Sequence, residues 1–235
     1  MPPKRLVIFV EGKGDVTAVP KLAQMIVSAT GAGDALFVDH NSFKVSGVGT
    51  LVKNECSNWH RWLEAAGKRK NLGAVLLVLD GDNDTVPPNW KRYVDKYKTD
   101  EFCAYRVAAM LGAEALPSRA GEAFSLAIVF SMKEFEAWLV ASIESLRGTT
   151  LAEGRGVVPA DAVFPEIDIE SKRDAKGVLG KLVPEYQQSL DQGILAAKVD
   201  PKLVAARCKS FRRFVHAIEQ LSSAVRSGAA VVSPI

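Results

Sequence analysis

The chain contains few cysteines and no long hydrophobic run. Cys56, Cys103 and Cys208 lie far apart and form no CxxC pair, which argues against a zinc site and against a disulfide framework. The apolar run near the N-terminus extends only from Leu6 to Val10 before Glu11 ends it. This run is too short for a signal-peptide core or a membrane span. We therefore expect a soluble protein of the reducing cytoplasm.

The chain also lacks a strong excess of charge of either sign. Its formal net charge is +3 over 235 residues. Such a small excess neither requires a nucleic-acid partner nor excludes one, because a basic groove can lie within a balanced total. The apolar fraction of 48% is enough for a substantial core. The length suits one large domain, or one domain with an appendage.

The most informative segment runs from Ala74 to Asp84 and reads AVLLVLDGDND. Its apolar part is typical of a strand that is buried on both faces of a parallel sheet. The acids that follow, Asp80, Asp82 and Asp84, repel one another unless a cation lies between them. Open α/β folds bind their ligands at the carboxyl ends of such strands. The segment therefore predicts a divalent-metal site, and a solvated acidic turn is the alternative.

Apolar strands alternate with helical segments through the first part of the chain. Strands are predicted at 6–10, 35–40, 74–79 and 124–130, and one of the intervening helices at 90–111. This alternation predicts a doubly wound, mostly parallel α/β domain over residues 1–147. No convincing strand follows. Residues 148–235 are predicted to form a helical C-terminal extension packed on that domain, with helices over 172–183 and 201–225 and an irregular tail.

Acids stand at two further strand ends. Glu11 and Asp15 follow the first strand, and Glu134 and Glu136 follow the strand over 124–130. In a parallel sheet these strand ends share one edge, so we expect the acids to converge there. Oxygen ligands without His or Cys suit Mg²⁺ or Mn²⁺. A salt-bridge role for Glu11 and a helix-dipole role for Glu134 and Glu136 remain alternatives.

Three motif alternatives can be compared with these residues. A calcium loop would need glycine and glutamate where Thr85 and Lys91 stand, so that reading fails. The ATP-binding P-loop is absent, because Glu11–Asp15 lacks its glycine spacing and its Gly-Lys-Ser/Thr end. A phosphatase that uses Asp80 as a nucleophile stays open.

Two motifs together resemble the Toprim fold, over about residues 5–140. The first is a strand that ends in Glu11-Gly12, with Asp15 four residues after the glutamate, and the second is the later strand that ends in Asp80-Gly-Asp82. This fold occurs in topoisomerases, bacterial primases and the overcoming-lysogenization-defect (OLD) type nucleases. The segment 9–15, FVEGKGD, is closer to the nuclease branch. The segments EFEAWL (134–139) and CKSFRRF (208–214) resemble an uncharacterised bacterial group of stand-alone Toprim-like proteins.

The resemblance implies roles for the acids. Glu11 would be the general acid/base or a metal ligand, Asp80 and Asp82 would bind the catalytic ion, and Asp15 would serve a second ion. Asp84 would add a ligand or support the ligands from outside, and Glu136 or Glu134 would complete a site for one or two Mg²⁺ or Mn²⁺ ions. The nuclease relatives also use a C-terminal lysine near the scissile phosphate. Lys176 is our candidate for this lysine, with Lys181 and Lys172 as alternatives. Each of the three could equally be a solvated residue on the surface of a helix.

The resulting prediction is a magnesium-dependent nuclease that acts on DNA or RNA. The resemblance implies a bacterial defence or repair system and an ATPase protein partner. Lys13 and the basic cluster of Lys209, Arg212 and Arg213 are predicted to bind nucleic acid, although a solvated helix face is the alternative for the cluster. Two other functions remain open: a non-catalytic or conditionally active module that binds an ATPase, and a metal-dependent phosphohydrolase acting on a small phosphoester.

Overall fold

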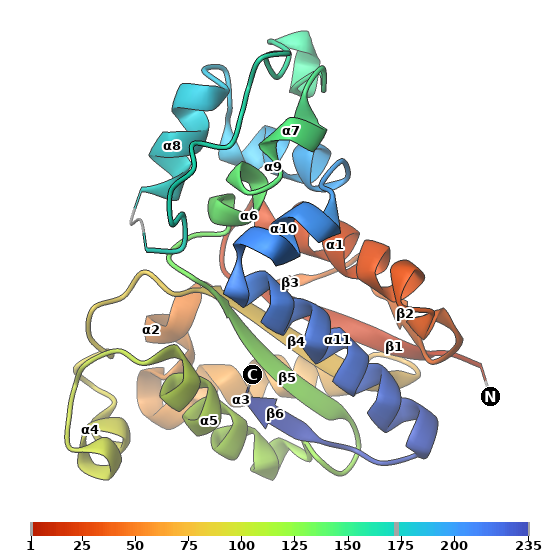
Figure 1. Ribbon diagram of the computed structural model, residues 1–235. Coiled ribbons are helices and arrows are strands. Elements are labelled where there is room, and N and C mark those ends of the chain that lie inside the picture. The colour runs from red at the N-terminus through yellow and green to blue at the C-terminus, as the bar shows by residue number, and fades with distance from the viewer. Residues whose placement is uncertain (1, 172–173, 235) are drawn as a thin grey trace.

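A six-stranded sheet forms the centre of the molecule (Figure 1). The computed structural model describes residues 2–171 and 174–234. All strand pairs are parallel. The strand order is β2-β1-β4-β5-β6, and β3 pairs with the end of β1. The strands are β1 (Lys4–Val10), β2 (Leu36–Val38), β3 (Phe43–Lys44), β4 (Leu72–Asp80), β5 (Ser125–Ser131) and β6 (Val232–Pro234).

The central strands are buried on both faces because their apolar side chains alternate between two cores. In β1, Leu6 and Ile8 point into one core, whereas Val7 and Phe9 point into the other. β4 and β5 divide their apolar residues in the same way. This is the arrangement that continuous apolar runs predict for a parallel sheet covered by helices on both sides.

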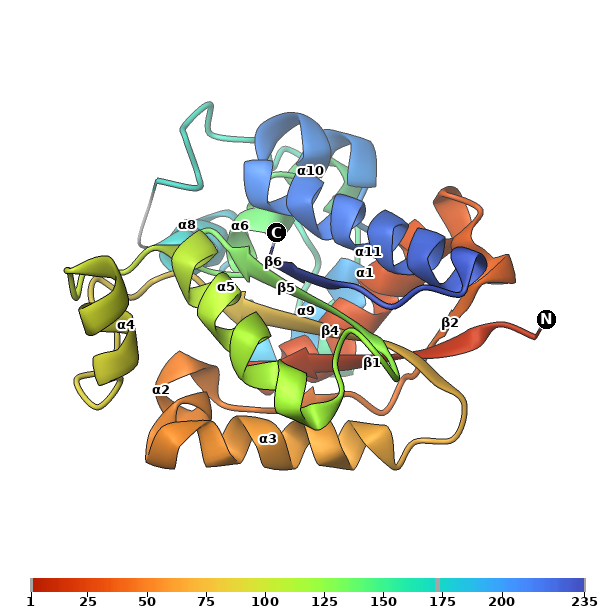
Figure 2. The same ribbon diagram turned by 90° about the horizontal axis from the view of Figure 1, so that it is seen from below.

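Helices cover both faces of the sheet (Figure 2). They are α1 (Asp15–Ala29), α2 (Gly47–Leu51), α3 (Lys53–Gly67), α4 (Lys91–Tyr97), α5 (Ala104–Ala115), α6 (Glu136–Val140), α7 (Ile143–Leu146), α8 (Ala175–Leu182), α9 (Gln188–Ala196), α10 (Pro201–Arg207) and α11 (Lys209–Ser227). α1 and α11 share one core, and α3 and α5 share the other. No helix in the described ranges is long and apolar enough to cross a membrane. The predicted α/β class is confirmed, and the parallel sheet is consistent with a Toprim-like fold.

The C-terminal part is joined to the sheet at two places. α11 packs against β5 and β4 on the same face as α1. β6 then pairs with β5, with Leu126 opposite Val232. The prediction of an irregular tail without a strand was therefore wrong. The last apolar residues form an edge strand of the sheet by pairing with a segment about 100 residues earlier in the chain. No local sequence pattern reveals such a pairing.

Two helices predicted as continuous are each divided. Lys98 has φ 57° and ends α4, and the following turn pairs with the loop after β4 through the Val86 and Phe102 backbone N–H groups. Cys208 is extended, with φ −121°, and separates α10 from α11. Its buried side chain lies against Ala137, which requires the chain to turn inward there. The helix predicted to start at Lys172 has its first residues outside the described ranges, and α8 begins at Ala175.

Candidate functional site

The carboxyl ends of β1, β4 and β5 lie side by side and position the predicted acids. Val10 pairs with Val78, and Asp80 pairs with Ser131, so these strands end at nearly the same level. Glu11 follows β1, Asp80 ends β4, and Glu136 begins α6 just after β5. Their convergence follows from the parallel register. We call Glu11, Asp15, Asp80, Asp82 and Glu136 the acidic cluster.

Asp80 is held in a fixed orientation at the end of β4. Its Oδ1 accepts a hydrogen bond from the Ser131 hydroxyl at 2.7 Å and another from the backbone N–H of Phe135 at 3.0 Å. Burial raises the pKa of Asp80 well above its usual range, and the charges of Asp15, Glu11 and Glu136 raise it further, against the hydrogen bond from Ser131. A carboxylate that is oriented but electrostatically disfavoured is suited to binding a cation.

Glu11 lies between β4 and the start of α2. Its Oε2 accepts the backbone N–H of Asp80 at 3.2 Å. Gly47 has φ +73°, and a Cβ atom at this position would lie 2.5 Å from Glu11 Oε1. Only glycine therefore allows the loop before α2 to approach so closely. Burial raises the pKa of Glu11, the Asp80 N–H opposes this shift, and Asp82 and Asp15 add to it.

Asp15 begins α1 and is 5% exposed. Its Oδ2 accepts the backbone N–H of Gly12 at 2.8 Å, and its Oδ1 accepts Gln192 Nε2 at 2.9 Å. Gln192 comes from α9, is fully buried, and lies against Gly14, where a Cβ atom would overlap its Oε1. Burial raises the pKa of Asp15 despite both hydrogen bonds.

Glu136 is the most deeply buried member of the cluster, at 1% exposed. The Tyr186 hydroxyl donates a hydrogen bond to its Oε1 at 3.2 Å. Burial raises the pKa of Glu136 to about 7, and the charges of Asp15 and Glu134 contribute to the increase. The five acids of the cluster are thus coupled electrostatically, as the sequence predicted from their strand ends.

Asp82, the exposed member of the cluster, and the remaining predicted acids, Asp84 and Glu134, lie at its margin. Asp82 and Asp84 are exposed on the loop after β4. The Asp84 carbonyl accepts the N–H of Phe102, which ties this loop to the segment before α5. Glu134 uses its Oε2 to accept the backbone N–H of Lys176 at 2.8 Å. Glu134 therefore connects the end of β5 to the first turn of α8.

The predicted cations are distributed over three places. The Lys176 amino group donates to Gln188 Oε1 at 3.3 Å, so the structure turns it toward α9. Lys181 is exposed on α8, Lys13 is exposed on the turn after β1, and Lys172 lies outside the described residues. The predicted cations of α11 line one cavity of about 720 Å³, whose walls include Lys209, Arg212, Arg213 and also Lys133.

The sequence did not reveal the residues that position the cluster. Gln192 and Tyr186 lie more than 100 residues from the strand ends with Glu11 and Asp80, and no motif marks them. Only the packing of α9 against α1 brings Gln192 to Asp15. Ser131 could have been found, because it is the polar residue that ends the strand next to β4.

The donor atoms of the cluster suit a hard divalent cation. They are carboxylate oxygens, which Mg²⁺ and Mn²⁺ prefer. Two of the carboxylates are almost fully buried, and burial of unpaired charge is costly. In the part of the chain that the structure describes, no three His, Cys, Asp or Glu side chains form a group that could hold a metal ion as they stand. Ion binding would therefore require side-chain rotation, which the partly exposed Glu11 and the exposed Asp82 allow.

Comparisons with known proteins find a family and two solved structures. The C-terminal region of the Xanthomonas campestris pv. campestris OLD protein is 17% identical, with a TM-score of 0.42 over 96% of this chain and 97% of that one. The C-terminal region of the Burkholderia pseudomallei OLD protein is 19% identical, with a TM-score of 0.39 over 94% and 98%. No curated protein matches. A family model matches residues 10–219, and the chain thus belongs to the family described as a domain of unknown function, DUF4276.

Proposed function

We propose that this protein is a metal-dependent nuclease that hydrolyses phosphodiester bonds at the acidic cluster. The observation that supports the proposal is that four buried or half-buried acids have no cationic side-chain partner in the part of the chain that the structure describes. Within residues 2–171 and 174–234, no Lys or Arg side chain forms a hydrogen bond or ion pair with Glu11, Asp15, Asp80 or Glu136. A fold that keeps such a cluster at the ligand-binding edge of its sheet needs an external cation to neutralise it.

Each residue of the site has a proposed role. Asp80, Asp82, Asp15 and Glu136 would hold one or two Mg²⁺ or Mn²⁺ ions, with Asp84 as a further ligand. Such an ion supplies Lewis acidity and activates water for attack on phosphorus. Glu11 would act as a ligand or as the general acid/base, and burial raises its pKa above the ordinary glutamate value. Ser131 and the Phe135 N–H fix the orientation of Asp80.

Lys176 is the proposed cation near the scissile phosphate. Its backbone N–H contacts Glu134, which places it beside the cluster, while its amino group contacts Gln188. A change of side-chain rotamer would be needed for the amino group to reach a phosphate. Lys176→Ala is expected to reduce cleavage, whereas Lys198→Ala, which removes an exposed lysine just after α9, serves as the control. Equal activity of both variants would remove Lys176 from the site.

The test of the nuclease function is cleavage of plasmid DNA and of RNA with Mg²⁺ or Mn²⁺. We expect the wild-type chain to cleave at least one substrate, and the Glu11→Ala, Asp80→Ala double variant to lose about 10²-fold or more of this activity. Asp161→Ala, which removes an exposed acid outside the cluster, is the control. Undiminished cleavage by the double variant would refute the site. Trapping of a phosphate on Asp80 would instead support the small-phosphoester hydrolase.

The ATPase partner and the defence or repair role belong to the same proposal, and the sequence resemblance supports them. Copurification of an ATPase with the tagged chain, and a gain of nuclease activity when the two are mixed, are the expected results. Binding of the ATPase without cleavage by any mixture would favour the non-catalytic module.

A further inference from the structure

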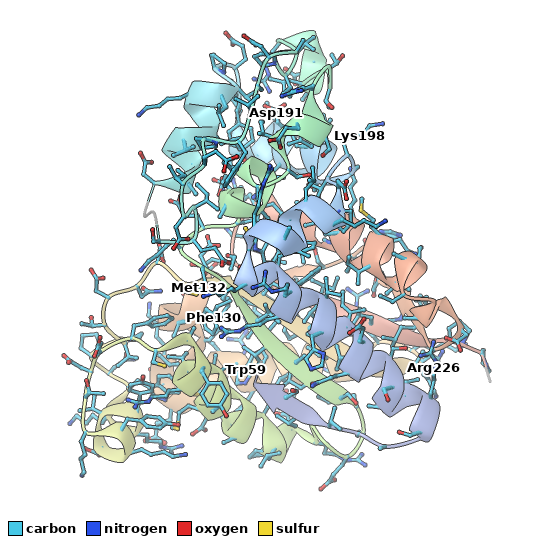
Figure 3. The ribbon with its side chains drawn as sticks, in the orientation of Figure 1. Trp59, Phe130, Met132, Asp191, Lys198 and Arg226 are labelled. Atoms are coloured by element: carbon cyan, nitrogen blue, oxygen red, sulfur yellow. The ribbon has the colours of Figure 1, made fainter. Side chains whose placement is uncertain are left out.

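A groove lies next to the loop that carries Asp82, between the first turns of α5 and α11. Its two parts are the cavity next to α11, of about 720 Å³, and a second cavity next to α5, of about 510 Å³. Both have Met132, Lys133 and Arg213 in their walls, so they adjoin along these residues. Figure 3 shows Met132 beyond Phe130 at the end of β5, near the start of α11. Gly81 and Asn83, from the loop that carries Asp82, also line the second cavity.

Cations dominate the walls of this groove. Lys133 and Arg213 lie at the junction, Arg106 lies at the α5 end, and Lys209 and Arg212 lie at the α11 end. In the described ranges, the side chains of Lys133, Lys209 and Arg213 form no hydrogen bond or ion pair. The wall carboxylates are Glu101, Asp168 and Glu170, and Glu170 is engaged by the backbone N–H groups of Lys209 and Ser210.

Two of the wall cations have distinctive local structure, and of these Arg106 is exposed and Lys133 is half-buried. The Arg106 guanidinium stacks over the Tyr97 ring at 5.1 Å, which leaves its N–H groups available at the edge. The backbone of Lys133 has φ 67°, a left-handed conformation that is uncommon for residues other than glycine. This conformation occurs at the residue between the two cavities.

An exposed aromatic ring lies among these cations. Tyr105 is 62% exposed in the first turn of α5 and lines the second cavity. Phe102 lines the same cavity and is fixed edge-on against Phe130, with ring centroids 5.6 Å apart. Aromatic rings next to backbone-binding cations are the elements with which proteins bind single strands, because an unpaired base can stack on the ring. A paired base in a duplex has no face free for such stacking.

We propose that this groove binds a single-stranded segment of nucleic acid and delivers it to the acidic cluster. A base stacks on Tyr105, and phosphates contact Arg106, Lys133, Arg213 and Lys209. This inference rests on the nuclease function proposed for the cluster, since it names the form of substrate that the site receives. It extends the basic cluster of α11 across the sheet edge to α5.

The test is a binding measurement that does not require cleavage. Fluorescence anisotropy with a labelled single-stranded oligonucleotide and with its duplex is measured in Ca²⁺, using the full chain. We expect the single strand to bind at least ten-fold more tightly than the duplex. Tyr105→Ala should weaken single-strand binding by about 5-fold or more, whereas Tyr105→Phe should retain it. Leu116→Ala, which removes exposed apolar surface at the other end of α5, should have no effect.

The cations are tested by the salt dependence of binding. Lys133→Ala and Arg213→Ala should each weaken single-strand binding and lower the slope of log K against log salt by about 0.7. Lys70→Ala is the control. Lys70 is exposed two residues before β4 begins, at the amino ends of the strands, whereas the groove lies at their carboxyl ends. Circular dichroism of each variant establishes that it is folded.

The outcomes separate the groove from the nuclease function. Preferential single-strand binding that depends on Tyr105, with no cleavage under any metal, would support the groove and refute the nuclease. Cleavage combined with equal binding of duplex and single strand, or with full binding by Tyr105→Ala, would refute the groove alone. Displacement of the oligonucleotide by poly-glutamate at equal affinity would also refute it, and would favour an acidic protein surface as the occupant.

Discussion

Asp191 and Glu136 are both almost fully buried carboxylates, at 0% and 1% exposed, but they differ in their partners. Asp191 accepts two hydrogen bonds from Arg155 Nη2, at 2.7 and 2.6 Å, and two more from the backbone N–H groups of Ala152 and Gln187. Glu136 accepts one from the Tyr186 hydroxyl at 3.2 Å. Figure 3 shows Asp191 within the helical part, away from the sheet edge.

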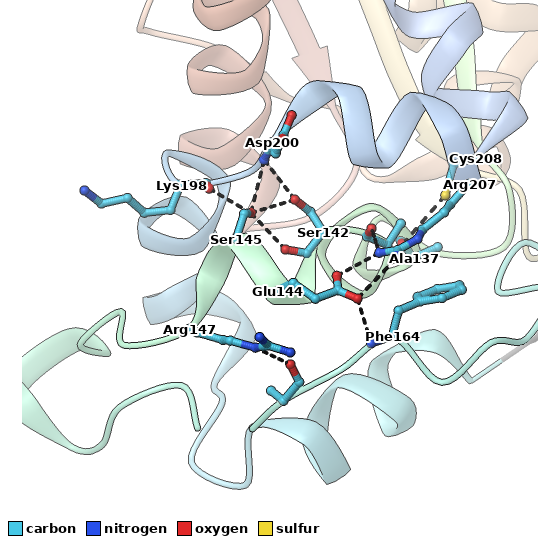
Figure 4. Close-up of polar contacts among 12 residues, drawn as sticks. Ala137, Ser142, Glu144, Ser145, Arg147, Phe164, Lys198, Asp200, Arg207 and Cys208 are labelled. Carbon is cyan, nitrogen blue, oxygen red and sulfur yellow. Dashed lines mark hydrogen bonds and ion pairs between the residues drawn. The ribbon is translucent and has the colours of Figure 1, made fainter. Parts of the chain in front are cut away.

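Glu144 belongs with Asp191 in this comparison (Figure 4). Although burial would raise its pKa, hydrogen bonds from Arg207 and from the Phe164 N–H lower the pKa of Glu144 to about 2. Asp191 and Glu144, which connect helices of the C-terminal half, therefore both have arginine partners. The acids of the sheet edge are bonded by neutral groups, at a cost to the stability of the ion-free chain. This difference is expected where a site is kept for a ligand.

The largest expected effect comes from removing the partner of Arg155. Asp191→Ala leaves a largely buried guanidinium without its carboxylate, so we expect a loss of about 3–5 kcal/mol in the free energy of unfolding. Urea denaturation measures this change. Asp161→Ala, on the exposed loop before α8, should change stability by no more than about 0.5 kcal/mol. Similar stabilities of the two variants would mean that the Asp191–Arg155 pair does not stabilise the fold, and Asp191 would then not differ from Glu136 in this respect.

The second effect concerns the cation itself. Mg²⁺ at about 100 times its dissociation constant should stabilise the folded chain by about 2.7 kcal/mol, because it binds the native cluster and not the unfolded chain. Thermal denaturation with and without Mg²⁺ measures this effect. The Glu11→Gln, Asp80→Asn variant should lose the Mg²⁺-dependent increase in Tm. An equal increase in this variant would mean that the ion binds elsewhere.

A smaller effect, with a pH dependence, is expected at Glu136. Its folded pKa of about 7 exceeds the ordinary value of 4.5, so its burial costs nothing at low pH and destabilises the ion-free chain as the pH rises from about 4.5 to 7. Glu136→Gln keeps an acceptor for Tyr186 and removes this cost. We expect the variant to be about 2 kcal/mol more stable at pH 8 and equal to wild type near pH 4.5. A variant less stable than wild type at pH 8 would contradict this account.

The smallest effect is expected at Glu144, with the opposite pH dependence. Its folded pKa of about 2 lies below 4.5, so its contribution is present above pH 4.5 and is lost as the pH falls toward 2. Because the pair is partly exposed, Glu144→Gln should cost only about 1 kcal/mol at pH 6. Urea denaturation at pH 6 and pH 3 measures whether the difference from wild type shrinks. A constant difference would mean that charge is not its cause.

Local patterns were sufficient for the three central strands and for naming the acids at their ends. β1, β4 and β5 are continuous apolar runs that end in polar residues, and such runs are specific for buried parallel strands. The roles of the acids stay predictions, although their convergence follows from parallel pairing. The division of the helices at Lys98 and Cys208 was not predictable, because long-range contacts override helical periodicity there.

The sequence by itself determined the α/β class and the set of carboxylates, because alternation and strand-end chemistry are local properties of the chain. The tertiary structure alone decided what surrounds these carboxylates. It brought Gln192 to Asp15 and Tyr186 to Glu136, paired β6 with β5, and placed Tyr105 and Arg213 in one groove. These contacts join segments about 50 to 180 residues apart, and the packing of whole helices against the sheet sets them.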